Sequence, residues 1–171
     1  ETRALLAAAR KAGAFDRLSR ERIGAELERI LDQDAVVQAF RLLRAWHLLP
    51  VIHPRFQAGR TFLERLGAAR AARNRAAGAI DDAPSQADVL WLVVAAAIPR
   101  ADRARLERMV PGGSARRRRF REGPEKARRA VAALGRARRR AAAARVLEGL
   151  DLPELLYAAA IAGEDARERI D

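Results

Sequence analysis

The chain has 171 residues and a formal net charge of +12; half of its residues are hydrophobic and 5% are aromatic. This length supports one helical domain or two small ones with a shared core, and the charge favours a polyanionic partner, either nucleic acid or an anionic membrane surface. The absence of cysteine excludes disulfides and thiolate metal sites and fits a cytoplasmic protein. The longest apolar run, 89–98, is too short to span a bilayer, so we expect no membrane partner.

The composition predicts an all-α fold, an irregular array of about eight or nine helices, because Ala, Leu, Arg and Glu favour helices and β-branched residues are sparse. A first helix over 2–12 should end at Gly13, where a left-handed residue is favoured. Ser19 should cap the next helix. The apolar stripe of that helix, at helical spacing, is Ile23, Leu27, Ile30 and Leu31.

Four further helix starts follow from local signals. Asp34 is expected to cap a third helix with Val36 and Phe40 on its apolar face, and the apolar surface then continues to His53-Pro54. Thr61 and Glu64 match a capping box, which predicts a helix ending at Gly78. Ser85 with Asp88 should start an apolar helix that ends at Pro99. A short charged helix is expected after it and should reach about Val110.

The clearest break is Pro111-Gly112-Gly113-Ser114, which predicts a helical neck and body domain over 1–110 and a basic loop with tail helices over 111–171. We expect 116–121 to form a mobile loop whose charges add little to stability. Pro124 should begin a long helix that ends near Gly149. Further helices are expected over 151–162 and 165–170.

Charge is concentrated in 111–145, which holds thirteen basic and two acidic residues, or +11 of the net +12. Such a cluster is unfavourable without a counter-anion, so we predict that it neutralises RNA phosphates and does not read bases. Phe120 would add a stacking platform. The predicted RNA-binding residues are Arg116, Arg117, Arg118, Arg119, Phe120, Arg121, Lys126, Arg128, Arg129, Arg136, Arg138, Arg139 and Arg140.

Two stretches resemble a known family. Residues 18–31, L-S-R-E-R-I-G-A-E-L-E-R-I-L, and 40–54, F-R-L-L-R-A-W-H-L-L-P-V-I-H-P, resemble the bacterial tRNA nucleotidyltransferase and poly(A) polymerase family. The match is good over about 1–56 and loose elsewhere. His47 stands where the family usually has Gly, and Arg55 stands where Glu is usual.

The resemblance implies a neck, body and tail that hold tRNA or another RNA. In the family an N-terminal head carries the metal-binding carboxylates, and it uses Mg²⁺ and a nucleoside triphosphate. The chain starts at Glu1 without an initiator methionine, immediately after the position of the family's nucleotide-selecting motif. We therefore expect an inactive piece of a longer nucleotidyltransferase, with no cofactor, metal or small-molecule site of its own. The alternatives are a helical scaffold that binds a protein and a DNA-binding module.

Several motifs have simpler interpretations than catalysis. Asp32 and Asp34 are expected to be helix caps and not a magnesium-binding pair. His47 and His53 lack further ligands, and Trp46 and Trp91 are expected in the core. The remaining motifs are Arg22 with Glu26, either a surface pair or an internal structural pair, and Glu164-Asp165-Ala166-Arg167, a solvated helix start.

Overall fold

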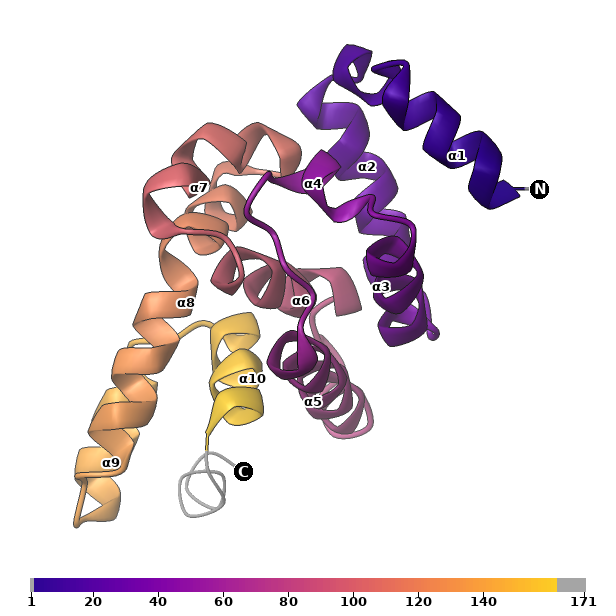
Figure 1. Cartoon of the computed structure of the whole chain (residues 1–171). Helices are drawn as coiled ribbons and strands as arrows, with labels where there is room; N and C mark the ends of the chain where they lie inside the picture. Colours follow the sequence, from indigo (N-terminus) through magenta and orange to yellow (C-terminus); the bar gives the residue numbers. More distant parts are fainter. Residues whose placement is uncertain (1, 163–171) are drawn as a thin grey trace.

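The computed structural model describes residues 2–162, and this part of the chain contains only helices, turns and loops, which confirms the all-α prediction (Figure 1). The expected helix over 165–170 and the motif at 164–167 lie outside the described residues. The α-helices are α1 (Thr2–Lys11), α2 (Arg20–Leu31), α3 (Val36–Ala45), α4 (Leu49–Ile52), α5 (Arg60–Ala77), α6 (Gln86–Ala96), α7 (Arg100–Leu106), α8 (Ser114–Leu134), α9 (Arg140–Leu147) and α10 (Leu152–Ile161), and the 3-10 turns are η1 (Ala14–Arg17) and η2 (Glu107–Met109).

The first helices follow their local signals. Gly13 has φ 67°, as expected of a residue that ends a helix in the left-handed region. The Ser19 hydroxyl accepts a hydrogen bond from the backbone N–H of Arg22 and so caps α2, whose Leu27 and Leu31 are buried. His47 has φ 57°, the conformation for which glycine is best suited, so the turn after α3 keeps a left-handed residue although no glycine is present.

Two predicted caps, Asp34 and Thr61, are wrong, and a third, Asp32, caps a helix distant in the sequence. The residue before α3 is Ala35, and Asp34 instead accepts a hydrogen bond of 2.7 Å from Arg70 of α5. The Asp32 carboxylate accepts a hydrogen bond from the backbone N–H of Ala87, so it caps the first turn of α6 and not the start of α3, the next helix in the chain. Helix α5 begins one residue before Thr61, which places that residue inside the first turn, where its side chain makes no cap.

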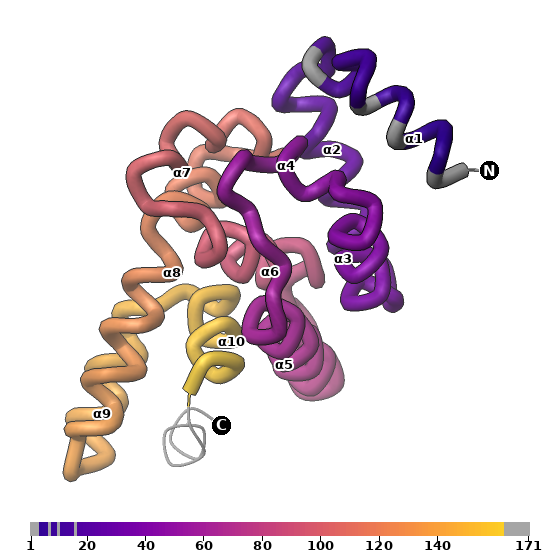
Figure 2. The backbone as a smooth tube through the Cα atoms, viewed as in Figure 1, coloured from indigo at the N-terminus to yellow at the C-terminus, as the bar shows by residue number. Residues whose placement is uncertain are grey.

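Helix α6 is the centre of the molecule. All residues from Val89 to Ala95 are buried, because α5, α8, α10 and α2 surround this helix (Figure 2). Ser85 caps it by accepting the N–H of Asp88, as predicted. Its apolar length is that of a core helix, and no helix within the described residues has the length and hydropathy needed to cross a membrane.

The third departure is α8. The predicted loop over 116–121 is helical, and Pro124 lies inside the helix instead of at its start. An internal proline costs about 3 kcal/mol because one backbone hydrogen bond is lost. Burial of Phe120, Ala127 and Ala130 against the core offsets that cost. The helix ends at Gly135, so the predicted long helix is two helices, α8 and α9, which pack against each other.

Candidate nucleic-acid interface

The basic segment has an inner face that is occupied by protein carboxylates. The Arg116 guanidinium donates to Asp88 at 2.8 Å and to Glu28 at 2.6 Å, and its side chain is only 16% exposed. It also donates to the Pro111 carbonyl and the Ser85 hydroxyl. This one side chain therefore joins α2, the start of α6 and the start of α8.

Four more basic residues of α8 have carboxylate partners. Arg119 pairs with Asp151, the residue that caps α10, at 2.8 Å and with Asp88 at 3.4 Å. Lys126 donates to Glu154 at 2.5 Å, and Glu154 completes the capping box of α10. The other two pairs are Arg121 with Glu107 and Glu122, and Arg128 with Glu125. Five of the thirteen basic residues thus have counter-ions within the protein.

These pairs lower the pKa of two carboxyl groups. Burial by itself would raise the pKa of Asp88, but the hydrogen bond from Ser85 and the charge of Arg116 outweigh it and hold this pKa below its usual range. Glu125 shows the same balance: burial would raise its pKa, and the bidentate contact with Arg103 lowers it. The Arg103 side chain is 2% exposed, so this pair ties α7 to α8 inside the molecule.

Phe120 does not offer a stacking platform. Its side chain is 1% exposed and meets Trp91 edge-on, with ring centroids 5.7 Å apart. The Trp91 indole N–H donates to Glu28 at 2.5 Å, so Trp91 is a core residue, as predicted. The prediction that Phe120 contacts RNA bases is wrong for this structure, because the helix that replaces the predicted loop turns this side chain inward.

Helices α8 and α9 form a hairpin, and its outward face carries the remaining positive charge of the basic segment. Eight exposed arginines form no ion pair with a carboxylate among the described side chains, and we call them the outer arginines. Arg118 and Arg129 lie on one face of α8, about 17 Å apart along its axis at 1.5 Å per residue, and Arg136 follows in the turn after the helix. Figure 1 shows that α8 starts beside α6 and that its other end, with α9, extends away from α6. The outer arginines are Arg117, Arg118, Arg129, Arg136, Arg138, Arg139, Arg140 and Arg145, of which Arg145 is an addition to the predicted site.

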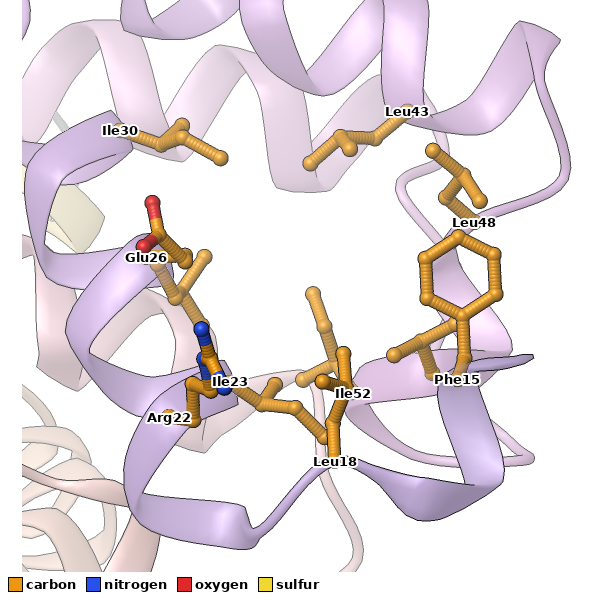
Figure 3. A pocket seen from close by; sticks show the side chains of 11 residues that line it. Phe15, Leu18, Arg22, Ile23, Glu26, Ile30, Leu43, Leu48 and Ile52 are labelled. Carbon is orange, nitrogen blue, oxygen red and sulfur yellow. The ribbon is translucent and has the colours of Figure 1, made fainter. Parts of the chain in front are cut away.

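A second, chemically different feature lies between η1, α2, α3 and α4. It is a pocket of about 210 Å³ with almost entirely apolar walls. Figure 3 shows Ile30 and Leu43 on one side of it and Leu18 and Ile52 on the other. Arg22 and Glu26 lie at its edge, and Glu26 pairs with Arg29 at 2.9 Å and not with Arg22.

The histidines take structural positions. His53 is 8% exposed; its Nδ1 accepts the backbone N–H of Arg55, and its Nε2 lies 3.2 Å from Asp102. Arg55 also contacts Asp102, so this group joins the end of α4 to α7. Among the described residues, no three His, Asp or Glu side chains are placed to hold a metal ion.

Fold and surface together define an all-helical protein with a cationic hairpin of two helices, α8 and α9. Residues 1–59 match a family model described as "Probable RNA and SrmB-binding site of polymerase A". No curated protein sequence matches the chain significantly. The matched segment contains both stretches on which the resemblance to the tRNA nucleotidyltransferase and poly(A) polymerase family rests, and this resemblance is confirmed.

Solved structures show the same fold over nearly the whole chain. A tRNA-processing enzyme, in the structure called complex 3, superposes with a TM-score of 0.80 at 20% identity over 95% of this chain and 44% of that one. A tRNA-processing enzyme in apo form 2 gives a TM-score of 0.77 at 22% identity over 95% of this chain and 46% of that one. A CCA-adding enzyme in apo form II gives 0.77 at 12% identity over 98% and 39%. The chain thus spans less than half the length of these structures.

Proposed function

We propose that this chain binds the RNA substrate of a cytoplasmic enzyme that adds nucleotides to RNA 3′ ends, by CCA addition or polyadenylation. The main substrate that we propose is tRNA. The observation that carries the proposal is the set of outer arginines, which are exposed on one hairpin and form no ion pair with a carboxylate in the described part of the chain. The family description and the fold of tRNA-processing enzymes support it. The resemblance assigns Mg²⁺ and the nucleoside triphosphate to the catalytic head, and we propose no role for this chain in binding either.

The outer arginines act by neutralising phosphates. Each guanidinium can donate two parallel hydrogen bonds to a phosphate, and each contact releases a condensed cation from the RNA. The logarithm of the binding constant then falls with the logarithm of salt concentration by roughly 0.7–0.9 per phosphate. Binding by this hairpin is therefore strong at low salt and largely independent of base sequence.

The test compares two triple variants with equal loss of charge. In the first, Arg117, Arg118 and Arg129 become Ala, and the control replaces the exposed residues Arg41, Arg75 and Arg105, which lie on α3, α5 and α7. Titration of fluorescent tRNA at several salt concentrations should show a slope flatter by roughly 2–3 for the first variant and by less than about 1 for the control. Equal effects of the two variants would mean that net charge, and not this hairpin, binds RNA. Preference for duplex DNA over tRNA would favour the DNA-binding alternative.

A second candidate function rests on the apolar pocket. The pocket lies within 15–52, inside the segment whose family description names the protein SrmB. We propose that an apolar side chain of such a partner enters it. Leu18 and Leu42 are exposed to similar extents, 36% and 39%, but only Leu18 lines the pocket. Titration with purified SrmB should show binding that Leu18→Glu abolishes and Leu42→Glu preserves, and equal affinities of the two variants would contradict the proposal.

A further inference from the structure

A recess lies where α8 turns into α9, at the far end of the cationic hairpin. It measures about 540 Å³, within the range of about 300–1,000 Å³ typical of sites for small organic groups. The residues that line it include three consecutive outer arginines, Arg138, Arg139 and Arg140, which we call its basic wall. The other lining residues of α9, Ala143, Ala144 and Leu147, are apolar, and we call them its apolar wall.

The recess exists because the start of α9 is made of small side chains. Residues 141–144 are all Ala, so the first turn of the helix leaves space beside it that a larger side chain would fill. This turn contains no acidic residue, and Arg139, which precedes the helix, makes no capping bond with its side chain. Within residues 2–162 the three arginines have no carboxylate partner, so their charge is available to a ligand.

The two walls suit the two parts of one nucleotide. A phosphate has the charge and geometry that adjacent guanidinium groups bind, and a base has two apolar faces that pack on aliphatic side chains. A paired base cannot make the second contact, because its faces are stacked within the duplex. A recess with both walls therefore distinguishes an unpaired nucleotide from the regular backbone that an exposed arginine row contacts.

We propose that this recess binds a single unpaired nucleotide of the RNA, with its phosphate on Arg138, Arg139 and Arg140 and its base against Ala143, Ala144 and Leu147. The inference rests on the proposed RNA-binding function and adds a preference to it. The rest of the outer arginines bind the backbone of paired RNA, and the recess selects RNA that has an unpaired base within reach of the hairpin tip.

The experiment uses two RNA hairpins that differ by one bulged adenosine in the stem, titrated against the full chain. Ala144→Trp fills the recess from an exposed position of α9. Ala142→Trp is the matched control, because Ala142 is also exposed on the same helix but does not line the recess. We expect the unmodified chain to bind the bulged hairpin about fivefold more tightly than the regular one, as one packed base can supply.

Ala144→Trp should reduce this ratio to about one and leave affinity for the regular hairpin unchanged, whereas Ala142→Trp should keep the ratio. Circular dichroism shows whether each variant folds. A ratio near one for the unmodified chain, or a ratio that Ala144→Trp does not change, overturns the inference while RNA binding itself stands. If the unmodified chain binds neither RNA hairpin at low salt, the proposed function itself is overturned.

Discussion

Replacing Arg116 with alanine tests whether the arginines of α8 that pair with carboxylates stabilise the fold or bind RNA. We call them the inner arginines, and they are Arg116, Arg119, Arg121 and Arg128. In the structure this guanidinium lies between two carboxylates, those of Glu28 and Asp88, and it also donates to a carbonyl and a hydroxyl. The variant removes the cation that the two carboxylates share, so that Glu28 keeps the hydrogen bond from the Trp91 indole N–H and Asp88 keeps its longer contact with Arg119, at 3.4 Å. Arg118→Ala, two positions along the same helix, is the matched control, because Arg118 is exposed and has no carboxylate partner in the described residues.

The magnitude follows from burial. Removing one partner of a fully buried ion pair costs about 3–5 kcal/mol, because a charge remains without compensation. The Arg116 side chain is 16% exposed and its partners are 22% and 26% exposed, so water screens part of that cost. We expect Arg116→Ala to lower the free energy of unfolding by about 2–4 kcal/mol, and Arg118→Ala to change it by less than about 0.5 kcal/mol.

The pH dependence separates this effect from lost packing. The pKa of Asp88 is lowered in the folded protein, so the pairing contributes stability above the ordinary carboxyl range and is lost as the pH falls through the folded pKa. Urea denaturation gives the free energy of unfolding of the unmodified chain and of Arg116→Ala, and the difference between these two free energies should narrow as the pH falls from about 5 to about 3. A loss below about 0.5 kcal/mol at pH 7, or one independent of pH, would refute the assignment of Arg116 as a structural cation.

Three other predictions concern substitutions at single positions, and chemical denaturation measures the free energy of unfolding in each case. A Cβ at Gly24 would lie 1.6 Å from the Met109 carbonyl oxygen, so Gly24→Ala should cost more than about 2 kcal/mol, whereas Gly67→Ala, with its nearest neighbour at 3.9 Å, should not destabilise. The Tyr157 hydroxyl is buried without a hydrogen-bond partner in the described part of the chain, so Tyr157→Phe should raise stability by about 1 kcal/mol, and a loss would reveal a partner. His47→Gly should add about 0.5–1 kcal/mol because φ is positive there, and a loss would mean that contacts of the imidazole matter more.

Sequence predicts those parts of this fold in which the decisive contact is local. Ser19, Ser85 and Asp151 lie within three residues of the N–H groups that they accept, and the capping pattern is therefore visible in the sequence. Asp34 and Thr61 show the limit of this reasoning. A residue with capping chemistry stands near a helix start in both cases, but the helix begins elsewhere, and Asp34 instead contacts Arg70, 36 residues away.

Helix α8 could have been predicted from a different signal. Phe120, Gly123, Ala127, Ala130 and Leu134 are spaced by three or four residues and form its buried face, but the run of arginines and the internal proline hide this periodicity. The partners of the inner arginines could not have been predicted. Glu28 is 88 residues from Arg116, and Asp151 is 32 residues from Arg119, so only the packing of α2, α6, α8 and α10 brings them together.

The charge argument for RNA binding therefore applies to fewer residues than composition indicates, and to a different place. Thirteen basic residues need counter-charges, and protein carboxylates provide them for five. The other eight lie on the outer side of α8 and around the start of α9, where no carboxylate of the described residues pairs with them. An RNA backbone that follows these arginines passes along the outward face of the hairpin and not along the inner face, where Arg116 and Arg119 already have partners. Substitutions of the outer arginines should consequently affect RNA binding without affecting stability, and substitutions of the basic residues that pair with carboxylates should do the reverse.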